Sequence, residues 1–425
     1  MYKRIYEFLE KHNIIYPNQF GFRLFHSTIH ALTHMTEFIR TSIDNNMFVA
    51  GVFIDLQKAF DTVDHNILLS KLNNYGIRGT ANEWFRSYLT NRKQFVSISG
   101  SKSYIAPVKY GVPQGSVLGP LLFLIYINDL HNAIIHSKTC HFADDTAILS
   151  ANQSLKQLQK HVNTDLKQLC HWLKANKISL NAGKTELMIF RNSHKAINYN
   201  LKIKINGKII IPSNKIKYLG IILDPHLNWS EHINYIAPKL NRAVGMLSKL
   251  RYFVNIHTLL NVYHAIFGSI LTYGCTIWGQ NLNSHIKRIC KIQDKAVTVI
   301  NFGKFNTDTL NLYVTSKIIK FEDQIKLENF LYAHSSLKGN VPSPLKKIFF
   351  IRSDHCDLST RGSTLTKLIL PKVRTQNYGI FSIKYRATAY WNLLMGKIPD
   401  NKFIDLKRAT VKEKIVNYFF ENYSN

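Results

Sequence analysis

Apolar positions in the first 190 residues follow two patterns, one typical of helices and one typical of buried strands. The clearest helical spacing lies in residues 154–176, where leucine or valine recurs every three or four positions. Residues 48–54 and 187–190 are apolar runs of strand length. The same patterns predict helices over residues 1–14, 27–44 and 79–90. Another helix should follow the capping residues 61–65 and end at Gly76. Strands are predicted over 95–98 and 106–110, and an apolar helix should run from the glycine-rich loop 111–116 to about Asn132.

Beyond residue 190 the pattern changes to short strands followed by long helices. Residues 203–210 alternate around Asn206-Gly207, which is a strong signal for a two-residue hairpin turn. Residues 218–223 are expected to form one strand. Further helices are predicted over residues 231–251, 257–278, 284–300 and 318–336, whereas residues 340–425 are basic, rich in tyrosine and without a clear pattern.

Two adjacent carboxylates, Asp144 and Asp145, lie between two short apolar runs that favour β-structure. This pattern predicts a tight hairpin with both acids at its tip. Like charges placed side by side repel each other unless a cation or a hydrogen-bond network offsets the repulsion. A third acid, Asp55, ends the apolar run 48–54.

Three acids of this kind can hold two divalent metal ions about 3.5–4 Å apart, an arrangement used for in-line displacement at phosphorus. Each piece also has a simpler interpretation. An Asp-Asp pair is often a solvated turn, and Asp55 alone can be a helix N-cap or the end of a strand. The metal interpretation therefore depends on further segments.

The chain of 425 residues carries 55 Lys and Arg against 26 Asp and Glu, a formal net charge of +29. Such an excess favours a polyanionic partner, and nucleic acid is the leading candidate. The alternative is charge that only keeps the protein soluble. The uneven distribution argues against that alternative, because residues 191–251 hold 11 basic residues and only two acids.

Cysteine usage and hydropathy bear on the compartment. The five cysteines form no CxxC pair, so neither a zinc knuckle nor a disulfide framework is indicated. The first residues already show amphipathic helical spacing rather than a secretion signal. The longest apolar run, Val117–Ile127, is too short to span a bilayer. An intracellular protein without a membrane segment is expected, with nucleus and cytoplasm both open.

The order of predicted elements resembles the palm of a nucleic-acid polymerase. The expected fold class is therefore α+β, a polymerase right-hand fold whose palm has a small antiparallel sheet backed by helices. Partial fingers and palm are expected over residues 1–190, a primer-grip hairpin and helical thumb over 191–300, and a basic C-terminal region over 301–425.

Six segments resemble, in order, those of non-LTR retrotransposon reverse transcriptases, especially the jockey type. Any one match is weak, but six ordered matches over roughly 210 residues form a strong signal. They are the fingers segment 19–23 with Ser27-Thr28, motif A at 53–61, motif B at 111–120, motif C at 142–145, motif D at 180–185, and the primer-grip segment 218–220 with 227–229.

The resemblance implies a catalytic site of three acids and two Mg²⁺ ions, with Mn²⁺ as a possible substitute. Asp55 and Asp144 would bridge the ions. Asp145 would either complete the site or influence it without binding a metal ion directly. Carboxylates, water and phosphate oxygens suit Mg²⁺ better than they suit a softer metal.

The resemblance also implies residues that bind the incoming nucleotide. The backbone after Leu56 would face the triphosphate, and Phe60 would block a 2′-hydroxyl by steric clash. Gln114 would approach the nucleotide or template strand, and Lys184 would lie near the triphosphate. Each has a structural alternative: Phe60 as a core aromatic, Gln114 in a plain glycine-rich turn, and Lys184 as a surface residue.

The implied partners are an RNA template, a DNA primer or an RNA–DNA hybrid, and dNTPs; the oligomeric state stays undetermined. Tyr218, Leu219 and Gly220 would support the primer terminus, and Gly115 would let the backbone approach the nucleic acid. Arg23 would contact a phosphate, although a structural salt bridge fits it equally well. Trp229 is expected to pack in the interior.

The implied function is RNA-directed DNA synthesis from dNTPs onto a primer 3′-hydroxyl. The family's upstream fingers segment and endonuclease are not seen, so the chain is expected to be an N-terminally truncated copy. One alternative is therefore a catalytically inactive remnant that binds nucleic acid. Another is a viral type of RNA-dependent RNA polymerase, against which Phe60 counts.

Overall fold

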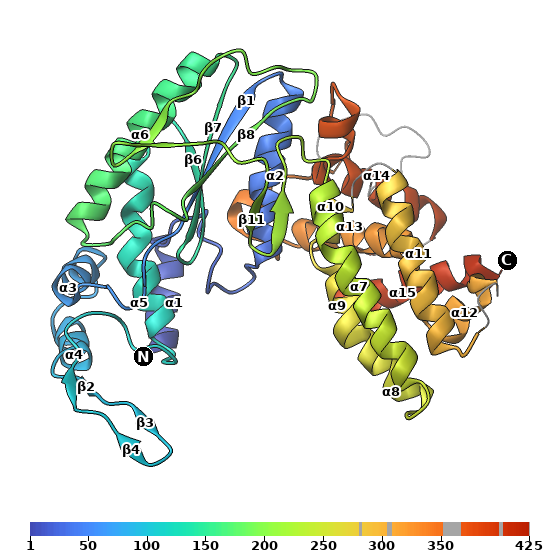
Figure 1. The fold of residues 1–425 in the computed structure, drawn as a ribbon, viewed down its shortest axis with the longest axis horizontal. Coiled ribbons are helices and arrows are strands. Elements are labelled where there is room, and N and C mark those ends of the chain that lie inside the picture. The colour runs from blue at the N-terminus through green and yellow to red at the C-terminus, as the bar shows by residue number, and fades with distance from the viewer. Residues whose placement is uncertain (280–282, 304–307, 352–366, 399–402, 425) are drawn as a thin grey trace. The chain divides into compact units, whose positions relative to one another are not determined.

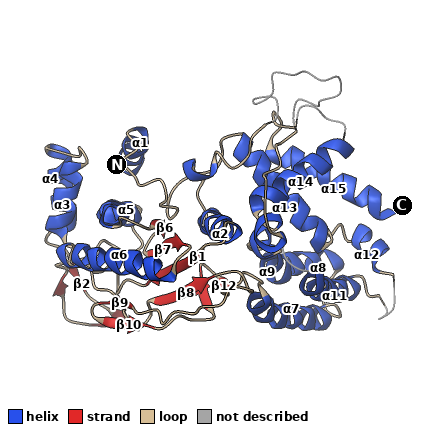
Figure 2. Cartoon of the chain, turned by 90° about the horizontal axis from the view of Figure 1, so that it is seen from above, coloured by secondary structure: helices blue, strands red, loops and turns tan. Residues whose placement is uncertain are grey.

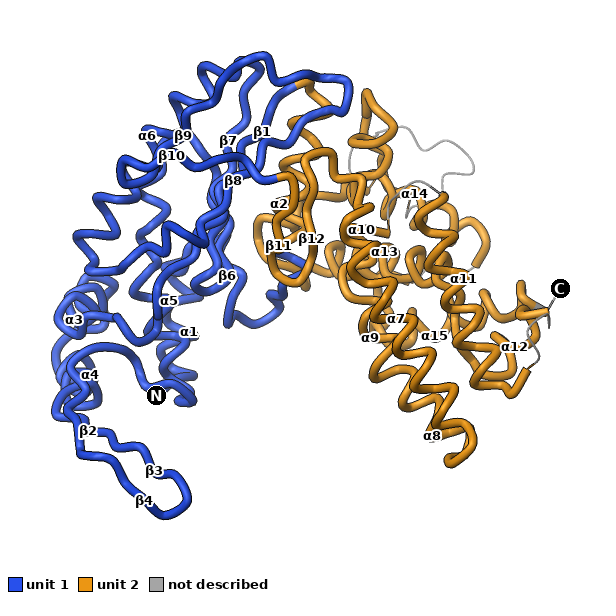
Figure 3. Tube along the Cα trace, in the orientation of Figure 1, with its two compact units in different colours: residues 1–31, 47–213 blue, residues 32–46, 214–425 orange. Residues whose placement is uncertain are grey.

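The computed structural model describes residues 1–279, 283–303, 308–351, 367–398 and 403–424. The chain divides into two compact units. Unit 1 comprises residues 1–31 and 47–213, and unit 2 comprises residues 32–46 and 214–425 (Figure 3). Helix α2 (Thr28–Asp44) begins in unit 1 and continues into unit 2.

Unit 1 is a mixed α and β structure (Figure 1). Its other helices are α1 (Tyr2–Lys11), α3 (His65–Asn74), α4 (Thr80–Leu89), α5 (Gly119–Ile127) and α6 (Leu155–Ala175). Its strands are β1 (Phe48–Ile54), β2 (Lys93–Gln94), β3 (Ser97–Ile98), β4 (Ser101–Lys102), β5 (Ala106–Pro107), β6 (Lys138–Phe142), β7 (Asp145–Asn152), β8 (Glu186–Phe190), β9 (Ile203–Ile205) and β10 (Lys208–Ile210).

The centre of unit 1 is a four-stranded antiparallel sheet in the order β6-β7-β1-β8. β1 lies between β7 and β8, and all seven of its residues are buried. A central strand without a polar side chain fits this position, because both of its faces are covered. The other sheets are two-stranded, as expected of a mixed α and β fold with small antiparallel sheets.

Helices α5 and α6 share the hydrophobic core with the sheet (Figure 2). α6 buries five apolar residues at the predicted helical spacing, while Leu155 at its start is partly exposed. α5 is apolar on all sides, and its residues 121–127 are all buried, as expected of a helix inside a core. The side chains of α6 that enter the core are Leu158, Val162, Leu166, Leu169 and Leu173.

The described part of unit 2 contains one β-hairpin followed by helices. The hairpin is β11 (Ile216–Tyr218) with β12 (Ile221–Leu223). The helices are α7 (Ser230–Leu250), α8 (Ile256–Val262), a π-helix (Tyr263–Gly268), α9 (Ser269–Thr272), α10 (Cys275–Trp278), α11 (Asn283–Ile300), α12 (Thr309–Thr315), α13 (Phe321–Leu337), a second π-helix (Gln376–Ile380), α14 (Ile383–Lys397) and α15 (Arg408–Ser424).

Two local predictions, the Asn-Gly turn and the capping of α3, are confirmed. The Asn206-Gly207 turn joins β9 to β10 with both residues at positive φ. α3 is capped by Asp64, whose carboxylate accepts from two backbone N–H groups of the first turn. The cysteines at 140, 170, 275 and 290 are free, and Cys356 lies outside the described residues. Among the described helices, none has the length and hydropathy needed to cross a membrane.

Two predictions are wrong because a turn interrupts the pattern. Residues 218–223 form a hairpin turn rather than one strand, since Tyr218 pairs with Ile221 across Leu219 and Gly220. Residues 257–278 do not form one helix. A π-helical turn replaces the α-helix at 263–268, and Gly274 at φ +65° starts a new direction before α10. A side chain at Gly274 would also meet Ile221.

Candidate active site

The sheet of unit 1 brings the three predicted acids to one end. Ile54 pairs with Thr146 where β1 and β7 run antiparallel. Asp55 follows Ile54 directly, and Asp145 precedes Thr146, so both acids lie at the same end of the sheet. Asp144 occupies the turn before β7. The expected proximity of Asp55 to the paired acids is therefore confirmed.

The turn between β6 and β7 is tighter than expected. Phe142 pairs with Asp145, so the two turn residues are Ala143 and Asp144, and Asp145 is the first residue of β7. Ala143 has φ +54°, a conformation that L residues seldom adopt without support. The prediction of both acids at the tip is thus corrected to one acid in the turn and one on the strand.

The fingers segment holds this turn in place. The buried amide oxygen Oε1 of Gln19 accepts from the backbone N–H of Ala143 and of Gly21, each at 2.9 Å. The backbone on either side of Gln19 also exchanges hydrogen bonds with His141 of β6. Gly21 is required here, because a Cβ at this position would lie 2.4 Å from the backbone nitrogen of Ala143.

Arg23 forms a structural salt bridge, which is one of the two roles that the sequence allowed for it. Its Nε and Nη2 donate to the carboxylate of Glu10 at 2.9 and 2.8 Å, and its Nη1 donates to the carbonyl of Tyr16 at 3.0 Å. The Arg23 side chain is 8% exposed. Such a bidentate pair fixes the loop of residues 16–23 onto α1.

The motif D segment positions Asp55. The chain after β1 pairs with the segment around Leu180, through a bridge from Leu56 and a hydrogen bond from Gln57. Asn181 Nδ2 donates to Asp55 Oδ2 at 2.9 Å, and the Asn181 backbone N–H donates to the Asp55 carbonyl at 2.9 Å. Asn181 therefore fixes both the backbone and the carboxylate of Asp55.

The pKa values of the two paired acids, Asp144 and Asp145, are both raised. Partial burial raises the pKa of Asp145 to about 6, with further contributions from the charges of Asp144 and Asp55. Burial also raises the pKa of Asp144, a hydrogen bond from its own backbone lowers it, and the charge of Asp55 raises it again. A cation bound among them would relieve this repulsion.

The donor set fits a hard divalent cation. The carboxylates offer only oxygen atoms, which Mg²⁺ prefers, and it usually keeps water and substrate oxygens as further ligands. The described residues contain no preformed group of three or more acidic, histidine or cysteine side chains able to hold a metal by themselves. Asp55, Asp144 and Asp145 therefore lie at one end of the sheet without forming such a group.

Hydrogen bonds join motif A to motif B. Gln114 Nε2 donates to Asp61 Oδ1 at 2.7 Å, and the backbone N–H of Val112 donates to the carbonyl of Phe60 at 2.9 Å. The Phe60 ring stacks on Phe123 of α5 with centroids 4.2 Å apart. Phe60 is half-buried and packs against the hydrophobic core, as the alternative interpretation of a core aromatic expects.

Two predicted residues remain open to solvent. Lys184 is exposed. Gly115 is exposed at φ +78°, and nothing lies within 4 Å of the position where a Cβ would be built. The backbone N–H of Lys184 donates to the carbonyl of Asn181 at 3.1 Å, which connects Lys184 to the residue that holds Asp55.

The predicted primer-grip residues belong to unit 2. Leu219 and Gly220 form the two-residue turn between β11 and β12, at φ +43° and +79°. The Tyr273 hydroxyl donates to the Leu219 carbonyl at 2.7 Å, which supports this unusual conformation of a leucine. Tyr218 is buried beneath the turn, and Trp229 is fully buried as expected.

Sequence reasoning assigned no role to Gln19, Gly21 or Asn181, although all three lie inside segments matched to the family. Their roles depend on pairing between distant segments of the chain. A polar residue inside an otherwise apolar or glycine-rich motif was the only available signal.

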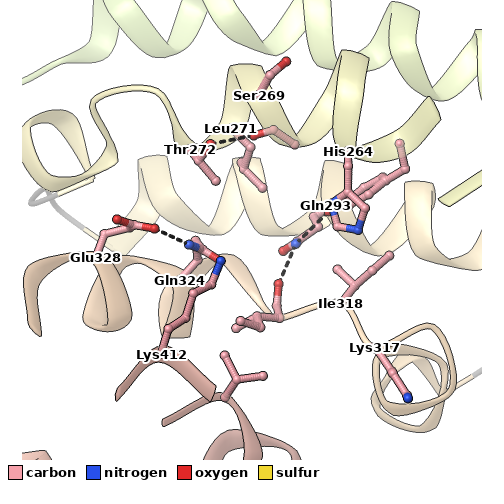
Figure 4. Close-up of a pocket in the computed structure, with 14 residues that line it drawn as sticks. His264, Ser269, Leu271, Thr272, Gln293, Lys317, Ile318, Gln324, Glu328 and Lys412 are labelled. Carbon is pink, nitrogen blue, oxygen red and sulfur yellow. Dashed lines mark hydrogen bonds between the residues drawn. The ribbon is translucent and has the colours of Figure 1, made fainter. Parts of the chain in front are cut away.

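A cavity lies among the helices of unit 2 (Figure 4). It has a volume of about 420 Å³, and its lining includes His264, Gln293, Gln324 and Lys412. It contains none of the predicted site residues. Gln324 donates to Glu328 at 2.9 Å at its rim, and Gln293 is held by Tyr263 and the carbonyl of Ile319.

Comparison with protein families gives a match over residues 1–223 to the family described as reverse transcriptase (RNA-dependent DNA polymerase). The chain is 30% identical over 339 residues to the RNA-directed DNA polymerase from mobile element jockey of Drosophila melanogaster. That alignment covers 77% of this chain and 36% of the relative.

Other relatives give the same picture. The probable RNA-directed DNA polymerase from transposon X-element of Drosophila melanogaster is 28% identical over 342 residues, covering 77% of this chain and 37% of the relative. The Pol polyprotein of the type-1 retrotransposable element R1 of Bradysia coprophila is 28% identical over 274 residues, covering 63% of this chain and 26% of the relative. The chain thus spans about a third of the length of these relatives.

Among solved structures, apo telomerase from Candida tropicalis aligns with a TM-score of 0.43 and 10% identity, covering 97% of this chain and 60% of that one. Telomerase from Candida albicans aligns with a TM-score of 0.35 and 14% identity, covering 76% and 53%.

Proposed function

Since the chain belongs to the reverse transcriptase family of non-LTR retrotransposons, we propose that it is an RNA-directed DNA polymerase. It transfers nucleotides from dNTPs to a primer 3′-hydroxyl on an RNA template. The observation that supports this most directly is the register of β1 with β7, which sets Asp55 beside Asp144 and Asp145.

The proposed architecture is the right-hand fold of polymerases. Residues 1–190 supply partial fingers and the palm, and the four-stranded sheet with α5 and α6 is the palm core. Residues 191–300 supply the primer-grip hairpin and thumb, and residues 301–425 form the C-terminal region. The family match supports the first of these assignments, since it covers residues 1–223.

In this proposal Asp55 and Asp144 would hold two Mg²⁺ ions, with Asp145 as the third acid. When bound, the ions activate the 3′-hydroxyl and neutralise charge on the triphosphate and leaving pyrophosphate. Asn181 keeps the carboxylate of Asp55 in one orientation. Gln19 supports the turn that contains Asp144, through its hydrogen bond from the backbone N–H of Ala143. Holding the acids in place beforehand lowers the cost of organising the site during reaction.

The surrounding residues bind the nucleotide and the strands. The backbone after Leu56 and the Lys184 ammonium face the triphosphate, and Phe60 excludes a 2′-hydroxyl. Its stacking on Phe123 supports this role, because a fixed ring discriminates better than a mobile one. Gln114 and Gly115 approach the template strand, and the turn of Tyr218, Leu219 and Gly220 supports the primer end.

The proposal is tested by primer extension with purified protein, an RNA template, a DNA primer, dNTPs and Mg²⁺. We expect extension by the unchanged protein and a loss of about 100- to 1,000-fold in Asp144→Ala, as removal of charge stabilisation at a transition state commonly costs. Asp165→Asn is unsuitable as a control, because Asp165 anchors the loop before β6. Asp308→Asn at the exposed start of α12 is the matched control and should extend normally.

Failure of the unchanged protein to extend any primer would overturn the proposal. Binding of RNA without extension would then favour the inactive remnant. Incorporation of rNTPs as readily as dNTPs would favour an RNA polymerase. Phe60→Ala should increase rNTP incorporation at least tenfold, whereas Phe60→Tyr, which keeps the bulk of the ring, should not.

A further inference from the structure

Unit 1 carries an exposed two-stranded arm formed by residues 91–110, between α4 and the motif B loop (Figure 1). β2 pairs with β5 near its base, and β3 pairs with β4 near its tip. The tip is a two-residue turn at Ser99 and Gly100, both at positive φ. Every residue of the arm except Val108 is exposed.

The arm has apolar side chains but little core of its own. An isolated two-stranded ribbon is only marginally stable in water. A group of exposed large apolar residues on a soluble protein commonly marks a binding surface. Tyr104 is 98% exposed, and the others exposed on the arm are Phe95, Val96, Ile98, Ile105 and Tyr110.

The charge of this region selects a polyanion as its partner. Residues 84–110 contain five Lys and Arg residues and no Asp or Glu. A protein partner of mixed charge would not require so one-sided a surface, whereas nucleic-acid phosphates would.

Rings and cations alternate along α4 and the arm. Trp84 stacks on Tyr88 with centroids 5.4 Å apart and an interplanar angle of 9°. The Arg92 guanidinium lies 5.7 Å from the centroid of Tyr88. Nearer the tip, the Lys102 ammonium lies 5.4 Å from the ring of Phe95. Aromatic side chains for stacking bases, with cations beside them for phosphates, are the usual means of binding single-stranded nucleic acid.

The arm is continuous with the candidate active site. Its last residue, Tyr110, directly precedes Gly111, whose backbone N–H donates to the carbonyl of Val63 at 2.8 Å. Gln114 in the same loop bonds to Asp61 of motif A. A nucleic-acid strand bound along the arm would therefore reach the catalytic acids by passing motif B.

We propose that the arm, together with Trp84 and Tyr88 of α4, binds single-stranded RNA by base stacking. The choice of RNA rests on the proposed function, in which RNA is the template. The stacking site itself is defined by this chain's own rings and cations. Duplex nucleic acid fits less well, because its bases are not available to stack on Phe95 and Tyr104.

The test is fluorescence anisotropy of a labelled 16-nucleotide RNA, measured without Mg²⁺ or dNTPs. The double variant Phe95→Ala/Tyr104→Ala should weaken RNA binding at least tenfold. Phe95→Tyr/Tyr104→Phe, which keeps both rings, should bind within twofold of the unchanged protein. Phe95→Leu/Tyr104→Leu separates the mechanisms, because it keeps apolar area and removes stacking, and it should bind like the alanine variant.

The role of the lysine side chains is tested separately, through the salt dependence of RNA binding. Lys93→Ala/Lys102→Ala should reduce the slope of log Kd against log salt by about 1.4, or about 0.7 for each phosphate of a single strand that the variant no longer neutralises. Asp308→Asn at the start of α12 should leave RNA binding unchanged, and since the binding assay contains no Mg²⁺ or dNTPs, loss of extension and loss of RNA binding are read separately.

Three results would overturn the proposal. The first is unchanged RNA affinity in the alanine variant. The second is full binding by the leucine variant, which indicates apolar contact without stacking. The third is a change of oligomeric state in the alanine variant with no change in RNA affinity, which assigns the arm to a protein partner.

Discussion

Asn181 donates a hydrogen bond of 2.9 Å from its side-chain amide to the carboxylate of Asp55. The bond joins the segment after α6 to the end of the central strand. The Asn181 side chain donates to Oδ2 of Asp55, and not to Oδ1. Asn181 is therefore a positioning residue for the acid that the sequence singled out first.

Asn181→Ala should reduce primer extension by about 10- to 100-fold, because a hydrogen bond to a charged group contributes about 1.5–3 kcal/mol. The loss should appear mainly in kcat and in the Mg²⁺ concentration needed for half-maximal rate, with a smaller change in KM for dNTP. Asn163→Ala is the matched control, since the half-buried Asn163 on α6 donates to the carbonyl of Lys202 and accepts from the backbone N–H of Lys204, so that its hydrogen bonds are to backbone groups rather than to an acid. Equal rates in both variants would remove Asn181 from the site.

The end of the central strand and its acid were predictable because an unbroken apolar run and its terminal charge are local features. The Asp144 turn was predictable only in outline. Its support by Gln19 depends on contact between segments more than 120 positions apart, which periodicity does not record. Leu219 shows a different limit, because a leucine at positive φ gives no turn signal in the sequence.

Gly21→Ala should destabilise unit 1 by about 2 kcal/mol, the usual cost of forcing an extra methyl group into filled space. The new Cβ would lie 2.4 Å from the backbone nitrogen of Ala143, which cannot retreat without leaving Gln19. Urea unfolding followed by circular dichroism measures the loss, and extension should fall at least tenfold.

The matched substitution is Gly245→Ala on α7, where nothing lies within 4 Å of the new Cβ and the backbone is helical. This change should stabilise the protein by about 0.5–1 kcal/mol, because alanine favours a helix over glycine. Losses of similar size in the two variants would show that the fit of Gly21 against the turn is unimportant.

Asp145→Asn should stabilise the metal-free protein at high pH. The pKa of Asp145 is raised to about 6 from its ordinary 3.8, so ionisation opposes folding progressively as the pH rises between these values. At pH 8 the full penalty is present. The variant should gain about 1 kcal/mol in free energy of unfolding, a figure reduced for the exposure of this side chain.

Urea unfolding in EDTA at pH 8 and pH 5 measures this gain, which should shrink at the lower pH. Millimolar Mg²⁺ at pH 8 should also reduce it, since a bound cation offsets the repulsion among the three acids. A gain that is the same at both pH values would contradict the electrostatic origin of the raised pKa.

Asp44 connects the end of α2 to the C-terminal region within unit 2. Its carboxylate accepts from the backbone N–H groups of Arg374 and Thr375 at 3.0 and 2.7 Å, and from the Thr375 hydroxyl at 2.6 Å. Two turns further back on α2, Glu37 accepts from the backbone N–H of Ile383 at 2.6 Å. These contacts hold residues 374–383 to α2.

Asp44→Ala should therefore lower the free energy of unfolding of unit 2 by about 2–4 kcal/mol, because three donors lose a charged acceptor together. Hydrogen exchange should become faster at Arg374 and Thr375 in the same variant. Asp308→Ala removes a single cap bond to Leu310 at the start of α12 and should cost only about 1 kcal/mol. If the two variants lost equal stability, with no faster exchange at Thr375, the carboxylate of Asp44 would be one surface acceptor among many. The C-terminal region would then be held to α2 by its apolar contacts alone.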